Sequence, residues 1–215
     1  SALLELNTPY KNISTAEDPV EYNVDGINQV QVNPEIGFDF PMALKAFLRQ
    51  DPEIIMVGEI RDLDTASIAF KAASTGHMVV STLHTNDAAS TVTRLVDMGV
   101  APYVVAEATS LVVAQRLIKS ICTHCKVDHK VAPQVLLEMG VKEEELELFN
   151  ELKKGEGCPR CHGSGLSGRM AIFEVLNIDP AIKRGILKGQ SPSELKQLAI
   201  DKTGMRSLRQ SALLK

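Results

Sequence analysis

A short apolar run, Ile54–Val57, constrains the fold of this chain more than any other stretch. Asp51 and Pro52 precede the run, and Gly58 and Glu59 follow it. Four uninterrupted apolar residues between turn signals are typical of a strand buried on both faces of a parallel sheet. Such sheets bind ligands beyond the carboxyl ends of their strands. Glu59 is therefore either a candidate site residue or the solvated acidic end of an ordinary buried strand.

The neighbouring sequence alternates between strand and helix patterns. We expect further strands at residues 13–16, 26–32 (an edge strand), 78–82 and 170–176. We expect helices at residues 1–6, at 40–48, from Asp62 or Asp64 to Gly76, from Asn86 or Asp87 to Gly99, at 102–118, and over much of 180–215. This alternation predicts an α/β fold with a parallel sheet, followed by a helical C-terminal region.

Polar residues follow three of the expected strands. The acidic cluster Glu17, Asp18 and Glu21 follows the first strand, Glu59 follows the buried run, and His84 follows the strand at 78–82. Because the carboxyl ends of parallel strands lie along one edge, we expect these clusters to converge.

The two histidines near the strand at 78–82 receive different interpretations. An isolated exposed histidine is more often structural than catalytic, but His84 follows a strand and is in register with two acidic clusters, which favours a functional role. His77 precedes the same strand, so we expect it at the opposite end, in a structural or interface role.

Four cysteines form two C-x-x-C pairs, Cys122 with Cys125 and Cys158 with Cys161, separated by residues 126–157. Two such pairs can place four thiolates tetrahedrally around Zn²⁺. The separation exceeds the commonest zinc-ribbon range, and the alternative is four unpaired buried thiols. Four thiolates leave no open coordination position for water, so the predicted zinc site is structural.

Composition narrows the class of protein. The 215 residues are 44% apolar, which suits a globular protein with a substantial core. No apolar run is long enough to span a bilayer, and the chain does not open on a signal peptide. The formal net charge of -4 argues against nucleic acid as the main partner. We expect a cytoplasmic protein.

Three segments together resemble one family closely. EDPVEY (17–22), RQDPEIIMVGEIRD (49–62), and TGH with STLHTN (75–77 and 81–86) resemble the Asp box, Walker B motif and His box of the type II/type IV secretion ATPase superfamily. AQRL at 114–117 and the two C-x-x-C pairs resemble its zinc-containing branch, which includes type IV pilus assembly ATPases and type II secretion ATPases. GMRSLR at 204–209 favours the pilus assembly enzymes.

The resemblance implies a RecA-like core at residues 1–118, a four-cysteine zinc module at 119–170 and a helical C-terminal subdomain at 171–215. Members of the family are homohexamers that couple ATP hydrolysis to movement of an inner-membrane platform protein. They work at the cytoplasmic face of the membrane without inserting into it. The resemblance therefore also implies ATP and Mg²⁺ as ligands.

The resemblance also assigns roles to site residues. Glu59 would be the general base and His84 would sense the γ-phosphate. Gly58 stands where many P-loop enzymes have the Asp that holds Mg²⁺, which leaves that task to Glu17, Asp18 and Glu21 through bound water. Arg61 and Arg116 would support the nucleotide site or a subunit interface.

One expected motif is missing from the sequence. ATPases of this kind need G-x-x-x-x-G-K-[ST] to cradle the phosphates, and the sequence contains no Gly-Lys pair. We therefore expect a fragment of a longer motor, with its P-loop upstream of Ser1, and we expect the fragment alone not to hydrolyse ATP.

Two alternatives to a pilus assembly motor stay open. The first is a type II secretion ATPase that powers protein export. The second is a zinc-stabilised binding module that docks a membrane partner without any chemistry of its own.

Overall fold

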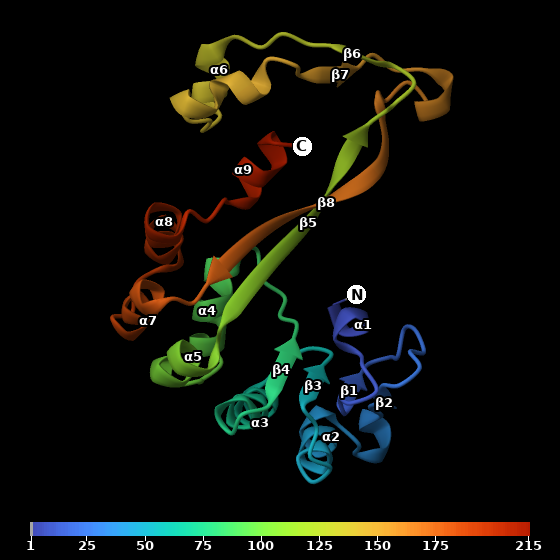
Figure 1. Cartoon of the computed structure of the whole chain (residues 1–215), viewed down its shortest axis with the longest axis vertical. Coiled ribbons are helices and arrows are strands. Elements are labelled where there is room, and N and C mark those ends of the chain that lie inside the picture. Colours follow the sequence, from blue (N-terminus) through green and yellow to red (C-terminus); the bar gives the residue numbers. More distant parts are fainter. Residues whose placement is uncertain (1) are drawn as a thin grey trace. The chain divides into compact units, whose positions relative to one another are not determined.

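The computed structural model describes residues 2–215, so Ser1 of the helix expected at 1–6 lies outside the described residues. The chain divides into two compact units (Figure 1). The first unit comprises the residues up to Ser110 together with Ile178–Leu195, and the second comprises Leu111–Asn177 together with Lys196–Lys215. The domain boundaries expected from the sequence, 1–118, 119–170 and 171–215, stay a prediction.

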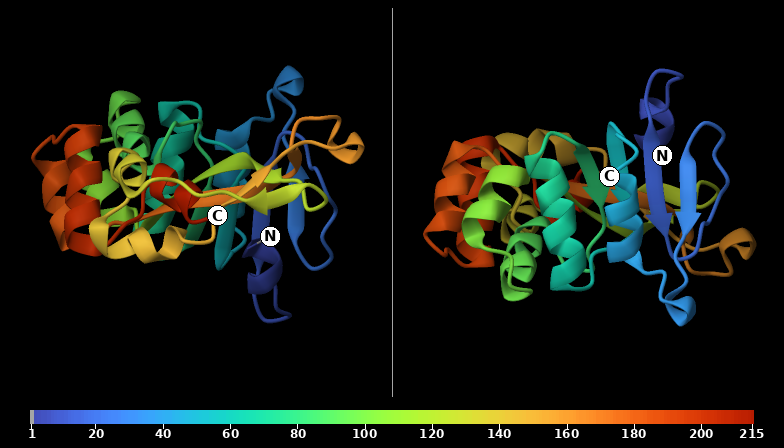
Figure 2. Two further views of the ribbon diagram at one scale, coloured as in Figure 1. Left: turned by 90° about the horizontal axis from the view of Figure 1, so that it is seen from above. Right: turned by 90° about the horizontal axis from the view of Figure 1, so that it is seen from below.

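A four-stranded parallel sheet organises the first unit. Its strands are β1 (Ile13–Glu17), β2 (Asn28–Gln31), β3 (Ile54–Val57) and β4 (Met78–Ser81). Their order is β2-β1-β3-β4, and each neighbouring pair is parallel. The right-hand view of Figure 2 shows β1 and β2, in blue, side by side and pointing the same way. The predicted α/β class, its parallel sheet and the edge position of β2 are confirmed.

Aspartates cap three helices of the first unit, two of them at predicted positions. Asp39 caps α2 (Phe40–Phe47), Asp62 caps α3 (Leu63–Ser74), and Asp87 caps α4 (Ala88–Asp97). In each case a side-chain oxygen accepts a hydrogen bond from a backbone N–H of the first turn, which satisfies a donor that the helix cannot pair. The remaining helices of this unit are α1 (Ala2–Leu6), the 3₁₀ turn η1 (Pro34–Ile36), α5 (Pro102–Ala108) and α7 (Pro180–Leu187).

The core of this unit lies between the sheet and its helices. Ile13, Leu44, Ile55 and Val57 are fully buried there. On the other face of β3, Ile54 is buried and Met56 is partly buried, so that face is less completely covered. This core fixes the strand ends from which the polar residues project.

The prediction of one long helix at 102–118 is wrong. Helix α5 ends at Ala108, and Thr109 already has an extended backbone. Leu111–Ile121 forms strand β5, which pairs antiparallel with β8 (Leu166–Asn177). The apolar residues of this stretch fit either period locally, and pairing with a segment distant in the sequence selects the strand.

The second unit contains the β5–β8 ribbon, an insertion that carries the cysteines, and residues 196–215. The insertion holds a short strand pair, β6 (Lys126–Asp128) with β7 (Lys153–Gly155), followed by the 3₁₀ turn η3 (Pro159–Cys161). Its helical parts are α6 (Pro133–Glu138) and the 3₁₀ segment η2 (Glu143–Phe149). Leu136, Val141 and Phe149 form a small apolar core there.

The C-terminal helices α8 (Pro192–Thr203) and α9 (Leu208–Leu213) follow the predicted helical pattern. Glu174 of β8 has no exposed surface, and its Oε2 pairs with Lys196 Nζ at 3.0 Å and accepts from the Leu208 N–H at 3.0 Å. A buried carboxylate is stable only when it is paired in this way, so Glu174 ties α8 and α9 to β8. Across residues 2–215, we find no helix whose length and apolar character would let it cross a bilayer.

Candidate functional site

Of the polar residues predicted to converge, Asp18, Glu59 and His84 lie together at the carboxyl edge of the sheet. Ala16 of β1 pairs in register with Val57 of β3, and Val57 pairs with Ser81 of β4. The three strands therefore end level with one another. The segments that carry Glu17 and Asp18, Glu59, and His84 leave the sheet side by side.

Glu59 lies at the centre of this edge. Its side chain is only 14% exposed, Oε1 accepts a hydrogen bond from Arg61 Nη2, and Oε2 lies 3.3 Å from His84 Nε2. The hydrogen bond from Arg61 lowers the pKa of Glu59 below its ordinary value, and burial opposes this effect without cancelling it. The positive charge of Arg61 adds to the lowering, and the interaction with His84 contributes further. Glu59 is therefore ionised at neutral pH.

Arg61 connects Glu59 to the acidic loop after β1. Arg61 Nη1 lies 3.8 Å from Asp18 Oδ2, while Nη2 contacts Glu59. The Arg61 side chain is 60% exposed and that of Asp18 is 37% exposed. One guanidinium thus spans two carboxylates that come from different strands.

Glu17 is held by two residues that sequence reasoning missed. Its Oε1 accepts from Thr15 Oγ1 at 2.6 Å and from Gln29 Nε2 at 2.9 Å. Gln29 also donates to the Tyr22 carbonyl at 2.9 Å, and its Oε1 accepts from the Val24 N–H at 2.6 Å. The one signal in the sequence was the polar alternation of the edge strand, which places Gln29 level with Thr15.

Glu21, the third acid of the predicted cluster, is exposed and lies on the loop between β1 and β2. That all three acids serve one Mg²⁺ stays a prediction.

Gly58 permits the close approach of β1 and β3 at this edge. Its N–H donates to the Ala16 carbonyl at 2.8 Å, and a Cβ added at Gly58 would lie 3.1 Å from that same oxygen. Thr82 Oγ1 donates to the Gly58 carbonyl at 2.6 Å, which links β4 to the same turn. A side chain at this position would crowd the Ala16 carbonyl, next to the residues that carry Glu17 and Glu59.

Two predicted residues are not part of this cluster. His77 precedes β4, and its Nδ1 lies 3.1 Å from the Ala72 carbonyl and 3.2 Å from Thr75 Oγ1. It therefore stabilises the end of α3, as its default structural role predicts. Arg116 lies on β5 in the second unit and donates to the Gln115 carbonyl at 3.2 Å.

The four cysteines form the second candidate site. Their sulfurs all lie within 4.8 Å of one another. Cys122 Sγ is 3.9 Å from Cys158 Sγ, and Cys161 Sγ is 3.8 Å from Cys125 Sγ. Four sulfurs bound to Zn²⁺ at about 2.3 Å in a tetrahedron stand about 3.8 Å apart. Both the donor set and the spacing therefore fit a zinc ion.

At Cys161, backbone amides favour the thiolate, which is the form that binds metal. Burial raises the pKa of Cys161, but hydrogen bonds from the N–H groups of Cys158 and Gly165, together with those of the Cys158 and Cys125 side chains, outweigh it and lower the value to about 6. Burial, together with the neighbouring thiols, raises the pKa of Cys125 to about 12. Thiols this close cannot all ionise without a cation that offsets their charge.

Two glycines allow the cysteine turns to pack together. A Cβ at Gly155 would lie 2.0 Å from the Gly165 carbonyl oxygen, and Gly165 itself has a positive φ of 70°. Only glycine fits such a close backbone approach. The Gly165 carbonyl in turn accepts from the Cys122 N–H at 2.9 Å, which joins the two C-x-x-C turns.

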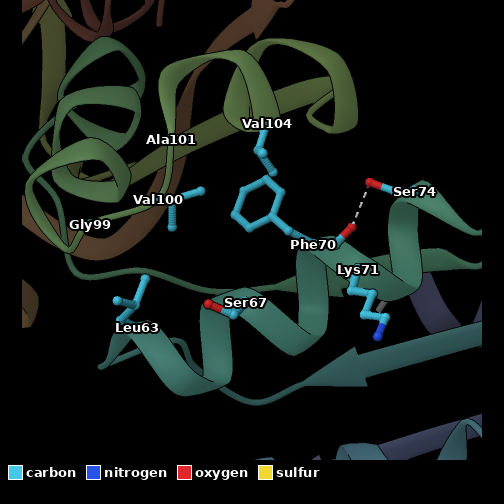
Figure 3. Close-up of a pocket in the computed structure, with 9 residues that line it drawn as sticks. All are labelled: Leu63, Ser67, Phe70, Lys71, Ser74, Gly99, Val100, Ala101 and Val104. Carbon is cyan, nitrogen blue, oxygen red and sulfur yellow. Dashed lines mark hydrogen bonds between the residues drawn. The ribbon is translucent and has the colours of Figure 1, made fainter.

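A separate hollow of about 320 Å³ lies on the first unit between α3 and the segment that leads into α5. Figure 3 shows the ring of Phe70 pointing toward Val104, with Val100 close by. The lining is mainly apolar, and Lys71 stands at its edge. None of the acidic residues described above lines it.

Comparison with known proteins places the chain in a family. Residues 1–215 match the family model described as Type II/IV secretion system protein. The chain is 52% identical to the type IV pilus assembly ATPase PilB of Thermus thermophilus, over 100% of this chain and 24% of that protein. It is 53% identical to PilB of Pseudomonas aeruginosa, over 98% and 37%. It is 46% identical to the type II secretion system protein HxcR of the same species, over 98% and 40%.

A solved structure agrees with this match. The structure of the pilus retraction motor PilT with bound ADP has a TM-score of 0.67 and 27% identity, over 98% of this chain and 50% of that one. The chain belongs to the type II/IV secretion system protein family. Within the family, four pilus assembly ATPases are 50–53% identical to it, and four type II secretion proteins are 41–46% identical. The chain spans 24–38% of the length of those pilus assembly ATPases.

Proposed function

We propose that this chain is the catalytic part of a RecA-like, hexameric motor that hydrolyses ATP to power type IV pilus assembly. The motor would act through an inner-membrane platform protein, from the cytoplasmic face of that membrane. The convergence of Glu59, His84 and Asp18 at one edge of the parallel sheet carries this proposal. The higher identity to pilus assembly ATPases than to secretion proteins supports the choice of machine.

Glu59 is the general base of the proposed reaction. A water molecule gives a proton to the Glu59 carboxylate while its oxygen bonds to the γ-phosphorus. The bond from that phosphorus to the bridging oxygen breaks, and ADP leaves with the electron pair. Limited exposure and two hydrogen-bonded oxygens hold Glu59 in a fixed orientation. His84, whose side chain is 90% exposed, reaches outward from Glu59 and is suited to contact the γ-phosphate.

The acidic loop is the proposed Mg²⁺ site. Glu17, Asp18 and Glu21 offer oxygen ligands, which Mg²⁺ prefers and often contacts through water. Arg61, adjacent to both Asp18 and Glu59, would support the nucleotide site, and Arg116 would support that site or a subunit interface. Phosphate binding also needs a P-loop, so we expect residues 1–215 alone not to hydrolyse ATP.

The cysteine cluster is the proposed structural Zn²⁺ site, with Cys122, Cys125, Cys158 and Cys161 as ligands. All four coordination positions are filled by protein thiolates, which excludes a catalytic water. In this role zinc replaces the large apolar core that so short an insertion lacks.

Glu59→Gln tests the proposed activity. The variant is made in a protein of the relatives' full length that contains this chain. We expect turnover of Mg-ATP to fall about 10²–10⁴-fold, the usual contribution of a positioned base, while binding of a fluorescent ATP analogue persists. Glu35→Gln, an equally conservative change at an exposed residue of η1, is the control and should leave turnover unchanged.

Wild-type turnover in Glu59→Gln would favour the alternative of a non-catalytic, zinc-stabilised module that docks a membrane partner.

The alternative of a type II secretion ATPase rests on the 46% identity of this chain to HxcR. Deleting the gene separates the two motors, because loss of surface pili with normal protein export supports pilus assembly, and the reverse phenotype supports secretion.

A further inference from the structure

Arg61 occupies a place that the roles above do not explain. It is two residues beyond Glu59, yet its guanidinium turns back onto that carboxylate and also faces Asp18. The proposed base therefore does not stand alone at the sheet edge. Its more exposed neighbour contacts it directly and links it to the acidic loop.

The shape of the guanidinium matters for this arrangement. Arginine presents five N–H donors on a rigid planar fork, whereas lysine is a compact point charge on a flexible stem. Here Nη2 contacts Glu59 Oε1 while Nη1 faces Asp18 Oδ2 at 3.8 Å. One planar group can meet two carboxylates at once in this way, and an ammonium group would have to choose between them.

We propose that Arg61 is a positioning residue that fixes the carboxylate of Glu59 and weakens it as a base to a degree set by Asp18. This inference rests on the proposed role of Glu59 as the general base. It assigns to Arg61 an action on the protein's own carboxylates, in place of direct contact with the nucleotide.

The side chains of Arg61 and Glu59 differ in how far they are exposed to solvent. Glu59 is 14% exposed and is also held by His84, whereas Arg61 is 60% exposed. The guanidinium therefore contacts Glu59 while most of its own surface stays in solvent. Because Asp18 faces the same guanidinium, its negative charge offsets part of the positive charge that acts on Glu59 while both contacts are made.

The charges around Glu59 act in opposite directions on its pKa. Arg61, on the same turn, lowers the pKa of Glu59 through its hydrogen bond and its charge, and His84 after β4 lowers it further. Asp18 of the acidic loop faces Arg61 and draws on the same positive charge. Removing Arg61 should therefore raise the pKa of Glu59, and removing Asp18 should lower it as long as Arg61 is present.

The first experiment measures the Glu59 carboxylate directly in residues 1–215, so it does not depend on ATPase activity. Carboxyl ¹³C shifts of labelled glutamate are followed against pH, and Glu59→Gln identifies the resonance. We expect Arg61→Gln to raise the pH midpoint of the Glu59 titration. The midpoint in Arg61→Lys should lie between those of wild type and Arg61→Gln. The matched control Arg49→Gln removes the same charge at an exposed residue before β3, and should leave the midpoint unchanged. An unchanged midpoint in Arg61→Gln would overturn the proposal.

A double-mutant cycle tests the part played by Asp18. We expect Asp18→Asn to lower the midpoint of Glu59 in the presence of Arg61, and to change it much less in the Arg61→Gln background. Equal shifts in the two backgrounds would show that Asp18 acts without Arg61, and would remove it from the proposal.

The second experiment follows the pH dependence of kcat in a protein of the relatives' full length. Because a base must be ionised to act, the acidic limb of the profile reports the pKa of Glu59. We expect Arg61→Gln to move this limb to higher pH, and Arg61→Lys to restore part of the shift. A uniform fall in kcat with an unmoved limb would show a merely structural role for Arg61. Failure of the proposed function looks different, because Glu59→Gln would then keep full turnover whatever Arg61 does.

Discussion

The sheet edge and the cysteine cluster both gather reactive side chains, but they hold them in opposite ways. At the sheet edge, Arg61 and His84 are largely exposed and project from a framework whose core is apolar. In the cluster, Cys122 and Cys161 are buried, and the apolar core of the same insertion is a small one built on Leu136, Val141 and Phe149. The residues at the sheet edge project from a region that its own apolar core stabilises. In the insertion, the cysteine cluster with its metal is expected to provide that stability itself.

This difference predicts how each region responds to change. Removing a side chain from the sheet edge should alter chemistry and leave folding nearly intact, because the strands are held by their own ladder and core. Removing a cysteine should unfold the insertion, because the metal that it binds replaces a core.

The largest expected effect is loss of the metal. Replacing Cys158 and Cys161 together with Ser should release zinc and unfold residues 119–170, since binding of structural zinc supplies on the order of 10 kcal/mol of folding free energy. Mass spectrometry of bound zinc and hydrogen exchange of the insertion measure this. Amides of Ile54–Val57 should keep their protection.

His124→Ala is the control for the metal experiment. His124 Nε2 lies 2.7 Å from Arg160 Nη1 at the exposed rim of the cluster, so its loss should leave zinc bound. If the double Cys variant kept its full zinc content and unchanged hydrogen exchange in the insertion, the idea that zinc stabilises this region would be wrong.

The next largest effect tests the apolar framework of the sheet. Ile55→Ala truncates a fully buried side chain in β3 and should lower the free energy of unfolding by about 2–5 kcal/mol. Chemical denaturation gives the value, and zinc content should stay constant. Ile36, which is 77% exposed, provides the control Ile36→Ala, expected within about 0.5 kcal/mol of wild type. Zinc loss in Ile55→Ala would mean that the two regions do not respond separately.

A smaller effect concerns the polar contacts that position Glu17. Gln29→Met keeps the shape of the side chain but removes its hydrogen bonds to Glu17, Tyr22 and Val24. A loss of about 1–3 kcal/mol is expected, because partly buried groups lose their partners. Faster hydrogen exchange at the Val24 amide reports the loosened loop.

The matched change Gln31→Met removes one long contact, 3.4 Å from the Val20 N–H, and should have little effect on stability or exchange. If the two variants behaved alike, Gln29 would have no special part in placing Glu17.

The smallest effect is the pH dependence of the Arg61–Glu59 pair. The hydrogen bond from Arg61 lowers the pKa of Glu59 in the folded protein, so the pair stabilises the fold above the carboxyl pKa of the unfolded chain. This contribution disappears as the pH falls through the folded pKa. The difference in unfolding free energy between wild type and Arg61→Gln should shrink between about pH 7 and about pH 3. A difference that grew toward low pH would contradict the lowered pKa.

Much of the first unit was predictable because its signals are local. The apolar run Ile54–Val57 needs burial on both faces, and Asp62 and Asp87 cap helices through contacts within one turn. Convergence of Asp18, Glu59 and His84 followed from the parallel topology, since level strand ends place their next residues together. The spacing within each C-x-x-C pair likewise predicted the clustered sulfurs.

By itself, then, the sequence determined the α/β class, the strand ends that carry the acidic residues and the cysteine quartet. Only the tertiary structure decided that Leu111–Ile121 is a strand, that Gln29 and Thr15 hold Glu17, and that Arg61 joins Glu59 to Asp18. The physical reason is the range of the interactions. Caps and apolar runs act over a few neighbouring residues, whereas the pairing of β5 with β8 and the shared guanidinium depend on segments that meet only after the chain has folded.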